Sequence, residues 1–189
     1  KTNDFISNGD GSRSEYVVWA SRSAVSGPSN EITEMWVNHG NHPTKYKFDT
    51  IDLSRLHFLR HFQMSNSNNS FESTDKIILP LDCSRLEHLE VTCTELEGLD
   101  RCSNLEYFRL KDSDMTSLDI SNLTLLTGFE LRSNRYLTTI IANNPIPGEN
   151  VISLWHDYLE NWDWLASFPN LEYFQKYYSY NYYNSGQST

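Results

Sequence analysis

Apolar residues recur along this chain as triplets spaced by three and then by two positions, a pattern that can be written LxxLxL. The alternation of the last two apolar residues with polar ones predicts a short strand with one buried face. One such strand cannot bury that face alone, so the copies are expected to stack as parallel strands around a shared core. Five clear copies occur, at Ile32/Met35/Val37, Leu59/Phe62/Met64, Leu86/Leu89/Val91, Leu105/Phe108/Leu110 and Leu126/Phe129/Leu131.

Longer self-similarities define the period of this pattern. The string NLEYF occurs at residues 104–108 and again at 170–174, and residues 51–64 align without gaps on residues 118–131. Weaker copies of the triplet follow at Ile152/Leu154 and Leu171/Phe174, and Phe174 is expected to face the core. The third apolar position of the clear copies falls at residues 37, 64, 91, 110 and 131, which gives spacings of 27, 27, 19 and 21. A period of about 22 residues predicts a repeat solenoid of roughly seven parallel strands.

The repeated unit resembles the leucine-rich repeat, LxxLxLxxNxL, over residues 32–176. In the clearest unit, LTGFELRSNRYL at residues 126–137, Asn134 takes the asparagine position and Tyr136 the next apolar position. The resemblance implies an α/β-type repeat solenoid with parallel strands on the concave face and an irregular or short-helical convex side. Short polar residues that can still hydrogen-bond the turn backbone take the asparagine position elsewhere, at Ser67, Thr94, Ser113 and Asp157.

A second recurring segment, LDIS at residues 118–121, is echoed by IDLS at 51–54 and LDCS at 81–84. These segments are similar to repeats found in surface and secreted proteins of gut bacteria. Their aspartates and serines are expected to cap short turns of helix on the convex side, which is a structural rather than a catalytic role for Asp52, Asp82 and Asp119.

A solenoid exposes a half-buried core at each end and needs caps. We expect residues 1–30 to form an N-terminal cap that includes a strand at Tyr16–Trp19. Residues 31–170 would form the leucine-rich repeats, and residues 171–189 a C-terminal cap and tail. The whole chain is then expected to be one structural domain.

Charge narrows the class of partner. The chain has 15 Lys and Arg against 25 Asp and Glu, and its net charge of −10 argues against nucleic acid. No apolar run approaches the roughly 18 residues that a membrane-spanning helix needs. Because the chain begins at Lys1 without Met, we expect either a mature product or a trimmed chain, from which any signal peptide would already be absent. Together with the bacterial resemblance, this predicts a secreted, cell-surface or periplasmic location.

Three cysteines allow at most one pair. Free buried thiols are the default interpretation for an odd number in a chain of this size. Cys83 and Cys102 each precede the first leucine of a copy by three residues, so they are expected to lie in adjacent coils. They either pack in the core, which we prefer, or form a disulfide.

Candidate chemistry is sparse. The strings HGNH and HFLRH suggest metal ligands, but the repeat register separates His57 from His61, so no metal site is predicted. His61 and His88 take equivalent outward positions on neighbouring strands and should approach each other. The chain contains no GxSxG, P-loop, GxGxxG or HExxH motif, and we expect neither enzyme activity nor a cofactor. The one local carboxylate cluster to check is Asp157, Glu160 and Asp163.

Residues between the buried positions of each strand point outward and form rows across the strands. One row alternates in charge at Glu90, Arg109 and Glu130, which cross-strand pairing explains, and the next row places Thr92 beside Lys111. Basic and aromatic residues gather toward one end of this surface, as is typical of recognition sites. The candidate binding residues are Tyr107, Arg109, Lys111, Arg132, Trp155, Tyr173 and Tyr177.

The predicted function is non-enzymatic recognition of a protein or peptide through the concave strand surface. An alternative is a glycan-binding or adhesive surface protein that uses the aromatic C-terminal end. There Tyr178, Tyr180 and Tyr182 would share one face of a strand, and their rings could stack on sugars. For this tyrosine run we prefer a role in capping the last coil over sugar binding, and Trp155 could belong to the same C-terminal cap.

Overall fold

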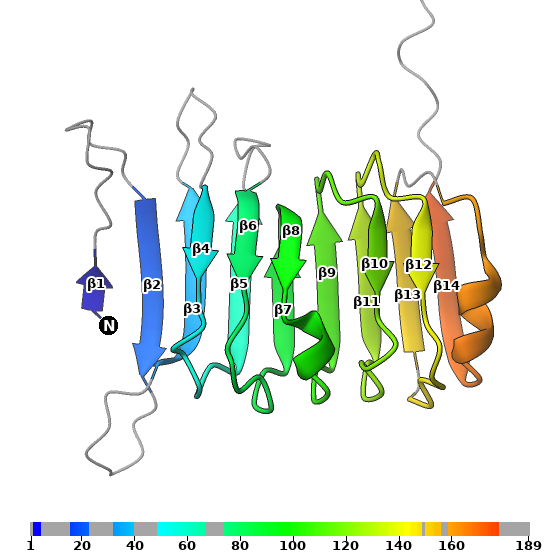
Figure 1. Ribbon diagram of the computed structural model, residues 1–189, viewed down its shortest axis with the longest axis horizontal. Helices are drawn as coiled ribbons and strands as arrows, with labels where there is room; N and C mark the ends of the chain where they lie inside the picture. The colour runs from blue at the N-terminus through cyan, green and yellow to red at the C-terminus, as the bar shows by residue number, and fades with distance from the viewer. Residues whose placement is uncertain are drawn as a thin grey trace, which may run out of the picture.

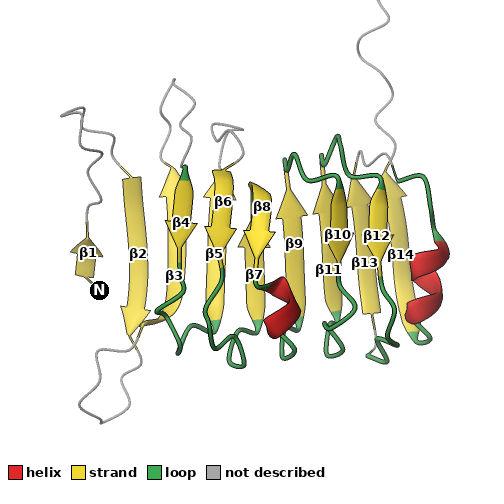
Figure 2. Cartoon of the chain, in the orientation of Figure 1, coloured by secondary structure: helices red, strands yellow, loops and turns green. Residues whose placement is uncertain are grey.

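The chain forms a repeat solenoid, as the sequence predicts. The computed structural model describes residues 2–4, 16–22, 32–39, 49–66, 74–148, 150–155 and 159–177. Adjacent coils stack side by side along the long axis of the molecule (Figure 1). One layer is a long sheet, called the main sheet below, and shorter strands form a second layer over it (Figure 2).

The main sheet has nine strands within the described residues, and β3 and the six strands after it run parallel. At the N-terminal end β2, which contains the predicted strand at residues 16–19, pairs antiparallel with β3, and β1 pairs antiparallel with β2. The cap boundaries at residues 30 and 171 stay predictions. In sheet order the strands are Thr2–Asp4 (β1), Tyr16–Arg22 (β2), Ile32–His39 (β3), His61–Asn66 (β5), His88–Val91 (β7), Tyr107–Lys111 (β9), Gly128–Arg132 (β11), Asn150–Trp155 (β13) and Leu171–Tyr177 (β14).

The register of the parallel strands is the one that the repeats predict. Equivalent positions of the LxxLxL copies pair across the whole run of strands. The central apolar positions in register are Met35, Phe62, Leu89, Phe108, Phe129, Ile152 and Phe174.

The second layer is made of strands, so the α/β type with a short-helical convex side is wrong for the described residues. Within those residues, helix is limited to two short 3₁₀ segments, Leu99–Arg101 and Asp163–Ser167 (Figure 2). The molecule is therefore a β-solenoid. In the described residues the second layer consists of two separate parallel sheets. The first contains Thr50–Asp52 (β4), Thr74–Ile78 (β6) and Cys93–Glu97 (β8). The second contains Ser117–Asp119 (β10) and Thr139–Ile141 (β12).

The core lies between the two layers. Alternate residues of β9 and β11 are buried, and the phenyl rings of Phe108 and Phe129 stack with centroids 5.9 Å apart. Trp164 from the second 3₁₀ segment meets Phe129 edge to face at 5.9 Å. Full burial of a side chain of this size contributes about 1.5–3 kcal/mol, so these contacts between neighbouring coils stabilise the solenoid.

The LDxS segments form turns rather than helix. The Asp52, Asp82 and Asp119 carboxylates each accept a hydrogen bond from the backbone N–H two residues on, at 2.9, 3.1 and 2.9 Å. This Asx geometry stabilises the corners where the strands at Thr50–Asp52 and Ser117–Asp119 end, and, at Asp82, the turn that follows the strand at Thr74–Ile78. The capping role is confirmed for the turns, and the expected helix is replaced by consecutive tight turns.

Buried polar side chains tie neighbouring coils together at the opposite corner. Asn134 is fully buried, donates from its amide to the carbonyl of Leu110 at 3.0 Å, and accepts from the N–H of Ser113 at 3.1 Å. The Ser113 hydroxyl in turn donates to the carbonyl of Cys93. Two of the predicted asparagine-position residues therefore do bind turn backbone.

Two expected core positions are exposed. Phe174 is 39% exposed because β14 is the last strand in the described order and only one strand, β13, packs beside it. Tyr136 is 58% exposed, and its neighbour Leu137 takes the buried place instead. The repeat after Asn134 is thus one residue longer than the resemblance implies.

Cys83 and Cys102 form a disulfide between adjacent coils, with Cα atoms 4.8 Å apart. The preferred interpretation, two free core thiols, is therefore wrong and the alternative is confirmed. Both side chains were expected at equivalent positions, and stacking of the coils brings them within bonding reach. Cys93 is buried and free, and burial raises the pKa of its thiol to about 12.

Removing the disulfide should destabilise the solenoid without changing its fold. We expect Cys83→Ala with Cys102→Ala to lower the free energy of unfolding by about 3 kcal/mol, because the bridge constrains a short loop of the unfolded chain. Denaturant unfolding with and without reductant measures this. Cys93→Ala is the matched control and should keep the reductant sensitivity of the wild type. Wild-type unfolding that ignores reductant, or three reactive thiols in the unreduced denatured chain, would contradict the bridge.

Candidate binding face of the main sheet

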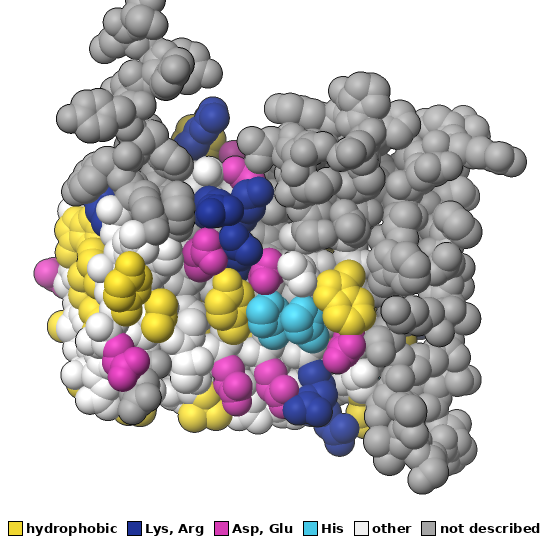
Figure 3. Space-filling model, turned by 180° about the vertical axis from the view of Figure 1, so that it is seen from behind, with side chains coloured by type: hydrophobic (Ala, Val, Ile, Leu, Met, Phe, Trp, Pro, Cys, Tyr) yellow, Lys and Arg dark blue, Asp and Glu magenta, His cyan; other side chains and the backbone are white. Residues whose placement is uncertain are grey.

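The outer face of the main sheet carries the side chains that alternate with the core positions. Figure 3 views the molecule from behind Figure 1 and therefore shows this face. A pair of histidines lies there between hydrophobic side chains, and a group of Lys and Arg side chains lies beside them (Figure 3). The face is thus divided into a ring-bearing part and a charged part.

Four rings form a ladder across neighbouring strands. His61 on β5 and His88 on β7 stack face to face, with centroids 4.1 Å apart, which confirms their predicted approach. His88 stacks in turn on Tyr107 of β9 at 4.4 Å. At the other end Trp36 of β3 lies 5.4 Å from His61, tilted by 41°. Strand spacing of about 4.8 Å brings equivalent rings into stacking distance.

The ladder ends over a glycine. The Tyr107 ring leans across Gly128 on β11, where an added Cβ would come within 2.5 Å of Tyr107 Cδ2. The Tyr107 hydroxyl donates to Glu130 Oε2 at 3.1 Å. A glycine inside a strand often marks such a close approach, so Gly128 is the sequence signal that could have placed this ring. Beyond Gly128, Val151 and Tyr173 continue the row and are 46% and 49% exposed.

The charged row forms one connected network. Arg109 donates to Glu90 on one side at 3.3 Å and to Glu130 on the other at 3.1 Å, which confirms the predicted cross-strand pairing. Glu90 also accepts from His88 at 3.0 Å and from the Gln63 amide at 3.2 Å. Arg132 Nε lies 3.8 Å from Glu130 Oε1. These contacts hold the Arg109 guanidinium in one orientation.

A pocket of about 210 Å³ opens beside this network, at the C-terminal end of β7. We call it the β7 gap; it is lined by Gln63, Met64, Glu90, Val91, Arg109, Lys111 and Arg132. It exists because β7 ends at Val91 while β9 continues to Lys111. The expected outward residue, Thr92, instead turns inward, is 3% exposed, and accepts a backbone hydrogen bond from Thr74. Thr92 is therefore not part of the outer row.

Burial and neighbouring charges set the ionisation of this face. Burial lowers the pKa of His61, and the adjacent His88 lowers it further. Burial alone would raise the pKa of Glu90, but the His88 hydrogen bond and the Arg109 charge outweigh it, and the pKa falls. Burial and the nearby Glu130 carboxylate raise the pKa of Tyr107, so its hydroxyl stays a donor.

The structure brings four of the candidate binding residues together. Tyr107, Arg109, Lys111 and Arg132 lie on the adjacent strands β9 and β11. Tyr173 lies on β14 and is exposed, separated from them by β13.

Trp155 and Tyr177 continue the Lys111 row by backbone register, while their side chains lie outside the described part. Tyr178, Tyr180 and Tyr182, on which the glycan-binding alternative depends, also lie outside the described residues. Sequence reasoning did not select Val151, Gly128 or the Gln63–Glu90 pair as site residues.

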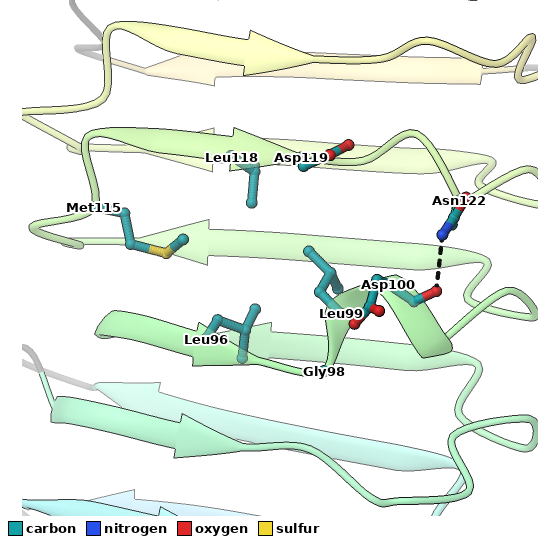
Figure 4. A pocket seen from close by; sticks show the side chains of 8 residues that line it. All are labelled: Leu96, Gly98, Leu99, Asp100, Met115, Leu118, Asp119 and Asn122. Carbon is teal, nitrogen blue, oxygen red and sulfur yellow. Dashed lines mark hydrogen bonds between the residues drawn. The ribbon is translucent and has the colours of Figure 1, made fainter.

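A second pocket, also about 210 Å³, lies in the other layer, between β8 and β10 where the two short sheets separate (Figure 4). Leu96, Leu99, Met115 and Leu118 project into it, and the Asn122 amide donates to the Asp100 carbonyl at its edge (Figure 4). Its lining is mainly apolar, so it offers less chemistry than the main-sheet face.

The other candidate sites considered from the sequence are a metal site and a carboxylate cluster. Within the described ranges, no group of three or more His, Cys, Asp or Glu side chains is placed to hold a metal ion. Glu160 and Asp163 are exposed, and Asp157 lies outside the description. Among the helices that the structure describes, none is long and apolar enough to span a membrane.

Comparisons with known proteins find no matching family model, and no curated protein or solved structure matches the chain significantly. Function is therefore inferred from the surface itself.

Gly128 is expected to be required for the position of the Tyr107 ring. Gly128→Ala should cost about 1–2 kcal/mol of unfolding free energy, because the new Cβ displaces the ring from His88 and Glu130. In a Tyr107→Ala background the same change should cost little. Urea unfolding of the four variants of this double-mutant cycle measures the coupling. Equal costs in both backgrounds would show that the ring does not lie over Gly128.

Lowering the pH should reduce the free energy of unfolding, because His61 is harder to protonate in the folded protein than in the unfolded chain. Its folded-state pKa lies below the unfolded value of about 6.5, so the unfolded chain binds more protons as the pH falls. The stability linked to His61 is full above that value and is lost as the pH drops through the folded pKa. His61→Gln should flatten the decline in unfolding free energy between about pH 7.5 and about pH 5. A decline as steep in the variant as in the wild type would contradict this role.

Proposed function

We propose that this protein is a non-enzymatic recognition module that binds a protein or peptide partner on the outer face of the main sheet. The observation that carries the proposal is the joining of three features across adjacent strands. These are the ring ladder ending at Tyr107, the exposed apolar Val151 and Tyr173, and the basic group at Arg109, Lys111 and Arg132. Aromatic and arginine side chains on a fixed scaffold are typical of binding surfaces.

Rigidity supports this function. The Arg109 guanidinium is held by two carboxylates and the Tyr107 ring by a stack and a hydrogen bond, so little side-chain freedom remains to be lost on binding. Parallel strands in continuous register also place these groups on regular secondary structure rather than on loops. A preorganised face of this kind is suited to recognition.

We also propose the finer family and location that the sequence suggests. The Asn134 and Ser113 hydrogen bonds support a relationship to leucine-rich repeats in which the convex side is made of strands. The Cys83–Cys102 disulfide supports a secreted, cell-surface or periplasmic bacterial location, because structural disulfides persist in oxidising compartments.

A peptide-display experiment tests the binding face. Peptides selected from a random displayed library on the wild-type protein should bind Val151→Gln about fivefold more weakly, since roughly 1 kcal/mol of apolar burial is lost. Leu81→Gln is the matched control, because Leu81 is also an exposed aliphatic residue but lies outside the main sheet. Selection of no peptides, or peptides that bind both variants equally, would overturn the proposal, and enrichment only on a glycan array would favour the alternative.

A further inference from the structure

We infer that the β7 gap receives an aspartate or glutamate side chain from an acidic peptide segment of the partner. This inference rests on the proposed function and names the chemistry of its ligand. The gap is bounded by four parallel strands, β5, β7, β9 and β11, each of which contributes a lining residue. A site built from four strands is fixed by the sheet itself.

The charge of the lining selects an anion. Arg109, Lys111 and Arg132 face the gap against a single lining carboxylate, Glu90. Carboxylates outside the lining that pair with these cations include Glu130, 3.1 Å from Arg109 and 3.8 Å from Arg132, and Asp112, 3.2 Å from Lys111. In a chain with a net charge of −10, this concentration of positive charge is local. An incoming anion would therefore approach three cationic side chains, of which Arg109 is already bonded to Glu90 and Glu130.

Glu90 limits how much negative charge the gap accepts. Its carboxylate is held in place by His88, Gln63 and Arg109, and its lowered pKa keeps it ionised at neutral pH. A dianionic phosphate would be repelled more strongly by Glu90 but also attracted more strongly by the three cations, so the apolar part of the lining distinguishes the two ligands. The floor of Met64 and Val91 is apolar and suits the methylene stem of a glutamate or aspartate. A side-chain carboxylate thus fits the lining best.

The exposed apolar row sets a second requirement on the partner. Val151 lies two strands from Lys111 and four residues back along the strand direction. With about 4.8 Å between strands and about 3.3 Å per residue, the separation is about 16 Å. An extended peptide covers this in about five residues. The expected segment therefore carries an acidic residue and a large apolar residue about five positions apart.

Asp112 provides a variant that should strengthen binding. Its backbone φ is 48°, a conformation that asparagine tolerates, so Asp112→Asn should fold normally. The change removes the carboxylate that pairs with Lys111 and leaves this lysine for the ligand. Misfolding of a variant can weaken binding but cannot strengthen it. A gain of affinity in Asp112→Asn is therefore evidence for the site itself, whereas a loss in another variant could reflect misfolding.

The test uses synthetic peptides selected from the random displayed library, with dissociation constants measured by fluorescence anisotropy. Selected peptides should contain Asp or Glu, and changing that residue to Asn or Gln should weaken binding about tenfold. Lys111→Gln should weaken binding to a similar degree, and Asp112→Asn should tighten it about two- to fivefold. Lys76→Gln is the matched control, because Lys76 belongs to β6 in the other layer and should have no effect.

The two proposals fail differently. Peptides that need Val151 but lack an essential acidic residue, or that bind Lys111→Gln as well as wild type, would overturn the carboxylate inference and leave the binding face standing. Binding that ignores Val151→Gln as well would overturn both. Peptides whose binding Asp112→Asn weakens would also contradict the inference, because that variant makes the gap more positive.

Discussion

The structure depends on one constraint, the burial of alternate side chains of each main-sheet strand against the equivalent side chains of the next coil. Phe62, Leu89, Phe108, Phe129 and Ile152 occupy one register, and all five are fully buried. A slip of one residue in any strand would turn its whole apolar set outward. The register is therefore strongly specified, and with it the position of every side chain on the outer face.

That outer face follows from the same register. Because equivalent residues align across strands, His61, His88 and Tyr107 stack as a ladder, and the acidic and basic residues of the next row pair in alternation. The β7 gap arises where one strand departs from the pattern and Thr92 turns into the core. The departure of β7 from the pattern of its neighbours thus forms a recess, with cations from the neighbouring strands around it.

Much of this could be predicted from the sequence, because a period of about 22 residues and a buried alternation leave few arrangements for the chain. The solenoid, the strand register, the approach of His61 to His88 and the Glu90–Arg109–Glu130 pairing all follow from it. The second layer could not be predicted, since segments of three to five residues carry too little periodicity to separate strand from helix. The sequence showed Cys83 and Cys102 in adjacent coils, but only the stacking geometry decides between packing and bonding. The Tyr107 position was missed because it depends on the absence of a side chain at Gly128. The β7 gap was missed because it depends on where β7 ends and on the burial of Thr92, which the repeat pattern does not show.

The central claim is that the outer face of the main sheet is the recognition surface. The most direct measurement is the change in backbone amide and arginine side-chain NMR signals as a selected peptide is added to the isotope-labelled protein. The account predicts that the shifted signals cluster on β7, β9, β11 and β13, with Arg109 and Arg132 among the largest. Shifts confined to the short strands β6, β8 and β10, around the pocket of Figure 4, would contradict it.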